Sequence, residues 1–150
     1  MTMFAVETYE SLLDDIKPML VPHKDELAVY EDIPLDPDYD FYRRAGEAGL
    51  LTFLTVREEG VLIGYAIFIV RLHAHYKGHR WALNDITWLH PNYRGAHIGA
   101  AFIAFWDKYF AEIGVNVVHV NTKTSHPALA YVLKQAGYKT IEHGHEKRIG

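Results

Sequence analysis

The segment from Trp88 to Ala100 constrains most strongly how this chain folds. It reads as the end of an apolar strand, a short loop that contains Arg94 and Gly95, and the start of an amphipathic helix. Backbone N–H groups at the start of a helix lack intrahelical partners and together carry about half a positive charge. A glycine-containing turn that leads into such a helix therefore predicts a phosphate-binding site. The alternative is an ordinary strand-to-helix turn, because Gly and Arg are common in turns.

The spacing of residues in this loop separates two families of phosphate-binding turns. Dinucleotide-binding folds have Gly-x-Gly-x-x-Gly and an acid about 20 residues later, and the loop does not match that pattern. It does resemble the phosphate-binding loop of the GNAT acetyltransferases, (Arg/Gln)-x-x-Gly-x-(Gly/Ala), which usually follows an apolar-x-Pro-x-Tyr strand end. Pro91, Tyr93, Arg94 and Gly99 match this pattern, and the middle glycine falls on His97.

The resemblance to the GNAT family extends over nearly the whole chain. Asp85–Leu89 is similar to the family's fourth strand, Val117–Asn121 to its fifth, and Pro127–Gly137 to its last helix. Three further stretches resemble GNAT proteins encoded by tailed bacteriophages: Leu35–Asp38, His73–Tyr76 and Asn84–Ile86. The resemblance implies one α/β GNAT domain over residues 1–150, with a mixed, mostly antiparallel, twisted sheet of six to seven strands and about four helices.

Hydrophobic periodicity gives a coarse outline of the elements that agrees with this fold. Apolar residues recur at helical spacing over residues 7–20, and Pro18 and Pro22 are expected to end that helix. Further helices are expected at residues 38–48, 98–113 and 127–137. Strands are expected at residues 3–6, 51–57, 61–75, 81–89 and 117–121, followed by a terminal hairpin over residues 138–149.

Composition restricts the function classes. The chain has 150 residues, of which 49% are hydrophobic, and a formal net charge of -4, which argues against general nucleic-acid binding. Its longest apolar run, Val61 to Val70, is about half of what a membrane helix needs, so we expect a soluble, cytoplasmic protein without membrane association. The absence of cysteine excludes an acyl-cysteine intermediate and a Cys-ligated zinc. Composition leaves a homodimer open.

The resemblance implies acetyl-CoA as the co-substrate and assigns residues to it. The backbone of Thr87, Trp88 and Leu89 would bind the pantetheine arm and the acetyl carbonyl, where an N–H group stabilises developing negative charge. His126 stands where the family commonly has an asparagine that touches the cofactor. The phosphates would lie on the loop and the first helical turn: Arg94, Gly95, Ala96, His97, Ile98, Gly99 and Ala100.

Asp85 is the candidate general base. An alkyl ammonium is almost fully protonated at neutral pH, so acetyl transfer to an amine needs a group that accepts the proton. Asp85 lies two residues before Thr87, which predicts that both side chains share one face of the strand. The alternative is a structural carboxylate that caps the backbone or pairs with Arg80 or Lys77.

The position of the family's general-acid tyrosine falls on Leu133. Tyr131 lies on the same predicted helix but about 200° around it, and it is the weaker candidate for a proton donor. Packing or substrate contact is the alternative role for this tyrosine. A CoA thiolate can also leave with water as the only donor.

Two regions are candidates for binding the amine acceptor. Residues 25–40 contain seven acids and neither Lys nor Arg, and in the GNAT family this region forms one wall of the acceptor site. Tyr30, Glu31 and Asp32 would select a cationic amine by charge pairing and cation–π contact, unless the run is simply solvated. His73 and His75 share a strand face and either line the acceptor pocket or satisfy a strand end. A metal site is not expected, because no carboxylate or third histidine has a tight local spacing.

Together these features predict an acetyl-CoA-dependent N-acetyltransferase. It would move the acetyl group directly to a primary amine in a ternary complex, the acceptor being a small-molecule amine, a peptide N-terminus or a protein lysine. The departures at His97 and Leu133 motivate an alternative, a catalytically weak acyl-CoA-binding or protein-interaction module on the same fold. A third alternative is a histidine-rich metal-binding protein.

Overall fold

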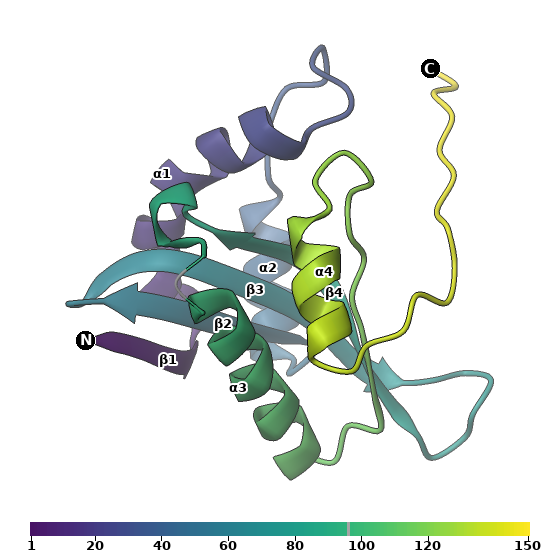
Figure 1. Ribbon diagram of the computed structural model, residues 1–150. Helices are drawn as coiled ribbons and strands as arrows, with labels where there is room; N and C mark the ends of the chain where they lie inside the picture. Colours follow the sequence, from purple (N-terminus) through teal and green to yellow (C-terminus); the bar gives the residue numbers. More distant parts are fainter. Residues whose placement is uncertain (96) are drawn as a thin grey trace.

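The computed structural model describes residues 1–95 and 97–150 (Figure 1). Its elements follow in the order β1 (Thr2–Glu7), α1 (Tyr9–Leu27), α2 (Tyr39–Glu47), β2 (Leu51–Glu58), β3 (Val61–Leu72), β4 (Arg80–Leu89), the 3-10 turn η1 (Pro91–Tyr93), α3 (Ile98–Glu112), β5 (Val117–His119) and α4 (Ala128–Gln135). None of the helices in the described residues is long and apolar enough to cross a membrane.

The strands form one sheet in the order β1-β2-β3-β4-β5. The first four strands are antiparallel to their neighbours, and β5 runs parallel to β4. The predicted mixed, mostly antiparallel sheet is therefore confirmed. β3 lies at its centre with seven consecutive buried residues, as a strand covered on both faces requires.

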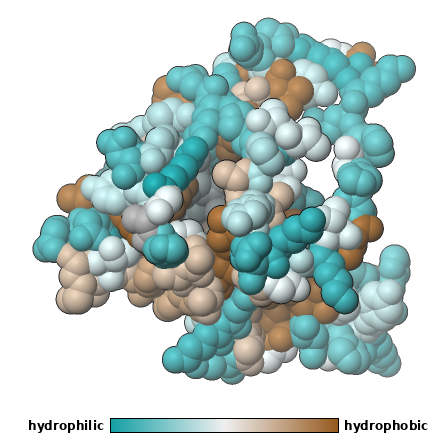
Figure 2. Space-filling view, viewed as in Figure 1, coloured by the Kyte–Doolittle hydropathy of each residue, from teal (hydrophilic) through white to brown (hydrophobic). Residues whose placement is uncertain are grey.

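The described residues form five strands and not the expected six to seven. The difference arises because the predicted hairpin over residues 138–149 does not form. The C-terminal residues instead form an extended tail that runs from α4 toward the loop between α1 and α2 (Figure 1). The space-filling view shows an opening between this tail and the rest of the molecule (Figure 2). Two polar contacts join the tail to the domain, one between Glu142 and His119 and an ion pair between Arg148 and Asp32.

Helix α1 continues through both prolines, so the prediction that Pro18 and Pro22 end it is wrong. Each proline removes one backbone donor, a loss that the tertiary contacts of this helix compensate. Thr8 accepts a hydrogen bond from the N–H of Ser11 at the start of the helix, and Leu12 and Ile16 are buried against the sheet. The last turn carries Glu26, which contacts β4 and the loop that follows it.

Each face of the sheet has its own apolar core. Helices α3 and α4 cover one face, where Phe68 of β3 packs edge-on against Trp106 and Phe110 of α3. Helices α1 and α2 cover the other face, where Tyr65 and Trp88 are buried. Figure 1 shows α3 and α4 in front of the sheet and α2 behind it. The sheet is therefore fixed from both sides, which holds β4 rigidly.

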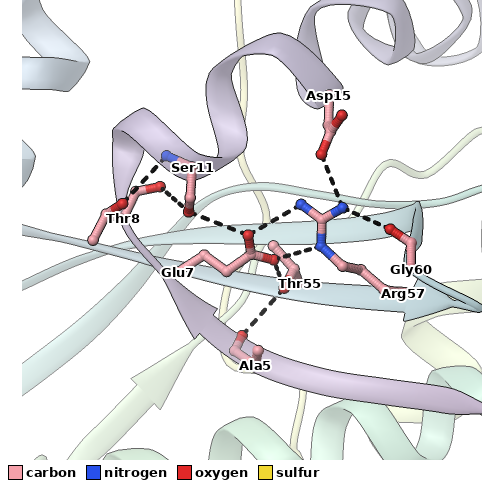
Figure 3. A network of polar contacts seen from close by, with 8 residues as sticks. All are labelled: Ala5, Glu7, Thr8, Ser11, Asp15, Thr55, Arg57 and Gly60. Carbon is pink, nitrogen blue, oxygen red and sulfur yellow. Dashed lines mark hydrogen bonds and ion pairs between the residues drawn. The ribbon is translucent and has the colours of Figure 1, made fainter.

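A polar network joins β1, β2 and α1 at the far edge of the sheet (Figure 3). The Arg57 guanidinium donates to both carboxylate oxygens of Glu7, at 2.9 and 3.0 Å, and lies 2.8 Å from a carboxylate oxygen of Asp15. The side chains of Arg57 and Glu7 are only 20% and 15% exposed. Thr55 donates a further hydrogen bond to Glu7. The network therefore ties the first strand to the sheet.

We predict that Arg57→Met destabilises the domain by roughly 3 kcal/mol, because it leaves the Glu7 carboxylate half-buried without its partner. The melting temperature should fall by roughly 10 °C, measured by calorimetry. Arg44→Met is the matched control, because Arg44 pairs with Asp40 on the surface, where the Arg44 side chain is 65% exposed. It should cost less than about 1 kcal/mol. Equal losses in the two variants would contradict the assignment.

Candidate functional site

One edge of β4 is open where the strand approaches its C-terminal end. Arg80–Leu89 pairs with β3 over its whole length, but only Trp81–Leu83 pairs with β5. Beyond Leu83, the edge that faces away from β3 has no strand partner among the described residues. Backbone groups along this edge are available to an extended ligand that adds to the sheet like a strand.

A β-bulge interrupts the pairing of β4 with β3 in the stretch whose other edge is open. Ile86 lies opposite Ile67 and Asn84 lies opposite Phe68, so Asp85 is the extra residue between them. The Asn84 side-chain amide donates to the carbonyl of Ile86 at 3.1 Å and to the Thr87 hydroxyl at 2.7 Å. These two hydrogen bonds hold the bulge in its shape. Bulges re-aim side chains, and this one turns Asp85 toward α2.

The Asp85 carboxylate accepts a hydrogen bond from the Tyr42 hydroxyl of α2, at 2.7 Å. Burial, together with this hydrogen bond, raises the pKa of Tyr42 well above its usual value, so the phenol keeps its proton at neutral pH. Asp85 itself is exposed. The alternative partners Arg80 and Lys77 form no ion pair with Asp85 among the described contacts.

The prediction that Asp85 and Thr87 share one strand face is wrong. Thr87 lies opposite Ala66, which belongs to the core under α3, whereas Asp85 points to Tyr42 on the α2 side. The bulge is the physical reason, since one extra residue reverses the alternation of side chains along a strand.

The loop after β4 leads directly into α3, as the sequence predicted. Gly95 and His97 have positive φ angles of 86° and 62°, and α3 begins at Ile98. His97 precedes the helix without a side-chain cap, so it leaves the N–H groups of the first turn, Ile98, Gly99 and Ala100, to other partners. A β-carbon at Gly99 would meet nothing within 4 Å, which shows open space there. The predicted contact at Ala96 lies outside the described residues.

Arg94 does not project freely into this space. Its two terminal nitrogens both contact the carboxylate of Glu26 on α1, one of them at 2.7 Å, and its Nε donates to the carbonyl of Leu89 at 2.8 Å. Glu26 also accepts a hydrogen bond from the indole N–H of Trp88 at 2.8 Å. The hydrogen bond from Arg94 lowers the pKa of Glu26 to about 2, against the desolvation that would raise it.

Buried aromatic residues hold Trp88 beside Glu26. His23 of α1 stacks on Trp88 with ring centroids 5.8 Å apart, and its Nδ1 lies 2.6 Å from the Tyr65 hydroxyl. Burial lowers the pKa of His23 to about 4, so its ring is neutral at pH 7. The predicted cofactor residue His126 lies just before α4, and its Nδ1 is 3.0 Å from the Ser125 hydroxyl.

The predicted acceptor residues lie in two separate places. One terminal nitrogen of Arg148 in the tail donates to both carboxylate oxygens of Asp32, at 2.7 and 2.6 Å, and the guanidinium lies 6.0 Å from the ring centre of Tyr30. Glu31 is exposed in the same loop. His73 and His75 belong to the turn between β3 and β4, where His73 packs on Trp81. Trp81 is four residues from Asp85, which is about 13 Å along a strand. The structure therefore does not bring the two histidines together with Asp85.

Two further predictions concern the proton donor on α4 and the absence of a metal site. Tyr131 is 67% exposed, whereas Leu133 is buried in the core under α3 and α4. The described residues contain no group of three or more His, Asp or Glu side chains arranged to hold a metal ion. Two site residues, Glu26 and Tyr42, were missed by sequence reasoning. Their contacts join residues 68 and 43 positions apart, and no local pattern marks them.

Comparison with known proteins identifies the fold. The profile of the acetyltransferase (GNAT) family matches residues 9–138. The chain belongs to the GNAT acetyltransferase family. Its domain is therefore that of an N-acetyltransferase, and the predicted GNAT fold is confirmed. No curated protein sequence matches the chain.

Solved structures of this family share the fold over the whole chain. A ribosomal-protein-alanine N-acetyltransferase from Brucella melitensis biovar Abortus 2308 has 17% identity and a TM-score of 0.76, with 100% of both chains covered. The aminoglycoside acetyltransferase meta-AAC0020 from an uncultured soil metagenomic sample, in complex with sisomicin, has 13% identity and a TM-score of 0.74, covering 99% of this chain and 97% of its own. A predicted acetyltransferase with acetyl-CoA from Clostridium acetobutylicum has 14% identity and a TM-score of 0.70, covering 99% and 96%.

We predict that His97→Gly retains the fold and stabilises it by up to about 1 kcal/mol, because glycine adopts positive φ without the strain of a β-carbon. Titration calorimetry with acetyl-CoA should show preserved or tighter binding. His97→Ala is the control, since it removes the imidazole but keeps the strain. If the His97 ring contacts phosphate instead, both variants should bind acetyl-CoA more weakly than wild type.

The lowered pKa of Glu26 predicts an acid-dependent contribution to stability. Because the folded-state pKa of about 2 lies below the usual 4.5, this contribution is complete above about pH 4.5 and is lost as pH falls toward 2. The stability difference between wild type and Glu26→Gln should therefore be on the order of 1 kcal/mol at pH 7, limited by solvent screening, and should shrink toward pH 2.5. Denaturant unfolding at several pH values measures it, and a difference independent of pH would contradict the ion pair.

Proposed function

We propose that this protein is an acetyl-CoA-dependent N-acetyltransferase that transfers the acetyl group directly to a primary amine in a ternary complex. The observation that carries the proposal is the open edge of β4 after Leu83, which begins at the Asp85 bulge and ends beside the uncapped start of α3. A strand edge, a carboxylate and a helix N-terminus thus follow one another along a single path.

These residues suit acetyl-CoA in order along that path. The first turn of α3 and the open space at Gly99 fit the phosphates, which helix N-termini bind through backbone N–H groups. The backbone of Thr87, Trp88 and Leu89 lies along the unpaired edge and fits an extended pantetheine arm. When bound, acetyl-CoA supplies an acetyl group on a thiol leaving group. The structure with acetyl-CoA from Clostridium acetobutylicum, at 14% identity, supports this choice of co-substrate.

Asp85 is the group that removes the proton from the acceptor amine. Its carboxylate is exposed, and the Tyr42 hydroxyl donates to one oxygen, which leaves the other oxygen free to accept a proton directly or through one water. Tyr42 fixes the direction of the carboxylate through this hydrogen bond. Once neutral, the amine attacks the acetyl carbon, the new C–N bond replaces the C–S bond, the nitrogen releases its second proton to water, and the thiolate leaves. Leu133 offers no proton to that thiolate, so water serves as the donor.

The acceptor is a primary amine of a small molecule, a peptide N-terminus or a protein lysine. The acidic, aromatic loop around Tyr30 and Asp32 supports a cationic acceptor, because it already holds a guanidinium, that of Arg148. Two related structures concern amines of different kinds, a ribosomal-protein alanine and an aminoglycoside. The domain is proposed to span residues 1–150, and a cytoplasmic location is expected.

We predict that Asp85→Asn lowers turnover 100- to 10,000-fold at pH 7 and leaves acetyl-CoA affinity within about threefold of wild type. Turnover should recover partly at pH 9 to 10, where more of the acceptor is already neutral. Steady-state kinetics with a panel of primary amines, calorimetry and thermal melting measure these quantities.

Asp14→Asn is the matched control, since Asp14 is an exposed carboxylate on α1 and makes no ion pair among the described residues. Wild-type turnover by Asp85→Asn at pH 7, or a loss explained by unfolding, would show that Asp85 is not the base. Absence of turnover by the wild-type protein with every amine, together with tight acetyl-CoA binding, would instead support a binding module.

A further inference from the structure

Arg94, which matches the arginine of the family's phosphate-binding loop, makes its hydrogen bonds within the protein. All three guanidinium nitrogens of Arg94 have partners within the protein, the carboxylate of Glu26 and the carbonyl of Leu89. A bidentate arginine–carboxylate pair is among the stronger and more directional polar contacts in proteins. An arginine held in this way cannot also point its fork at a phosphate without giving up both hydrogen bonds to Glu26.

Glu26 joins three parts of the molecule that meet at the start of α3. It comes from the last turns of α1, and it accepts hydrogen bonds from Arg94 in the loop and from the indole of Trp88 in β4. Trp88 is 3% exposed and stacks on His23, so its indole N–H is fixed in direction. The Glu26 side chain is itself only 20% exposed. The carboxylate therefore sits on a rigid base and restrains the loop from one side.

The loop needs such a restraint because its backbone is strained. His97 has a left-handed φ of 62°, which costs roughly 1–2 kcal/mol for a residue with a β-carbon. Without an anchor, His97 would relax to a more favourable φ value and would turn the first N–H groups of α3 away from one another. Phosphate binding by backbone groups depends on those groups pointing at one place before the ligand arrives.

We propose that Glu26 is a positioning residue for acetyl-CoA, which anchors the phosphate loop through Arg94, and that Arg94 acts through Glu26 rather than as a ligand of the phosphates. This inference rests on the proposed use of acetyl-CoA. It assigns the phosphates to the backbone of α3 and gives Arg94 a structural task. It predicts that Glu26→Gln weakens acetyl-CoA binding, whereas direct contact between Arg94 and the phosphates predicts that the same change strengthens it.

The test is a double-mutant cycle of Glu26→Gln and Arg94→Gln, with acetyl-CoA binding measured by calorimetry below the melting temperature of each variant. Each single variant should bind about tenfold more weakly than wild type. The double variant should bind no more weakly than Arg94→Gln alone, because the anchor is lost only once and the unpaired carboxylate has gone. Asp14→Asn, with the same change of charge on the same helix, should bind like wild type.

A kinetic readout separates positioning from general damage to the fold. Glu26→Gln should raise KM for acetyl-CoA about tenfold and leave kcat within about twofold. With S-acetylpantetheine, which has no phosphates, wild type and Glu26→Gln should react equally well. Glu26→Asp keeps the charge but shortens the side chain, so it should fold where Glu26→Gln does not and still bind acetyl-CoA several-fold more weakly.

Several results would overturn the proposal. Tighter binding by Glu26→Gln would show that Glu26 withholds Arg94 from the phosphates, which makes Arg94 a direct ligand, and equal binding would show that Glu26 has no effect on acetyl-CoA binding. Additive losses in the double variant, or an equal loss in reactivity with S-acetylpantetheine, would show that the two residues do not act on the loop as a unit. Absence of acetyl-CoA binding by wild type would refute the proposed function together with this inference, whereas binding by wild type and undiminished binding by Glu26→Gln would refute the inference alone.

Discussion

The unequal pairing of β4 is the constraint on which the rest of this structure depends. β4 is bonded to β3 over its full length, while β5 pairs with it at three positions only. Parallel pairing starts beside Trp81, and among the described residues the edge of β4 is unpaired from Asn84 onward. One end of the strand is therefore built into the sheet, and the other end carries the proposed binding surface. Gly64 of β3 helps to hold the open end, because a β-carbon there would lie 2.9 Å from Leu89 and 3.0 Å from the carbonyl of Trp88. The C-terminal end of β4 is therefore held by its close packing on β3, because β5 does not pair with it there.

Sequence reasoning succeeded where a local pattern has one physical solution. Three local patterns each predict an element without knowledge of its neighbours: the alternation of apolar residues in β2, the continuous apolar run of β3 and the apolar stripe of α3. The glycine-containing turn after β4 is a fourth. The family resemblance then arranged these elements correctly. Local rules failed where tertiary contacts decide, as in α1, where Pro18 and Pro22 are tolerated because buried Leu12 and Ile16 hold the helix on the sheet. They also failed for the tail, whose apolar residues Ile141 and Ile149 find no strand to pair with.

The candidate site was predictable in its backbone but not in its side-chain partners. The bulge at Asp85 has no signature in a single sequence, since it appears only when β3 and β4 are set in register. It changes the chemistry nonetheless, because it moves Asp85 from the face of Thr87 to that of Tyr42. The two residues that sequence reasoning missed, Tyr42 and Glu26, are both on helices of the α1–α2 side. The sequence of one segment can predict a strand or a loop. The partner of a side chain in that segment depends on which distant elements the fold brings beside it.

In both missed contacts, a helix on the α1–α2 side of the sheet holds a side chain on or after β4 in position. Tyr42 of α2 donates to Asp85 at the bulge, and Glu26 of α1 accepts from Trp88 and Arg94 at the end of the strand. α1 and α2 are joined by the acidic loop that carries Tyr30 and Asp32, the segment to which an acceptor is proposed to bind. A displacement of this helix pair on acceptor binding would therefore reach both the proposed base and the phosphate loop through single hydrogen-bonded side chains. The two substrates of a ternary complex would then be coupled by α1 and α2, not by direct contact between their sites.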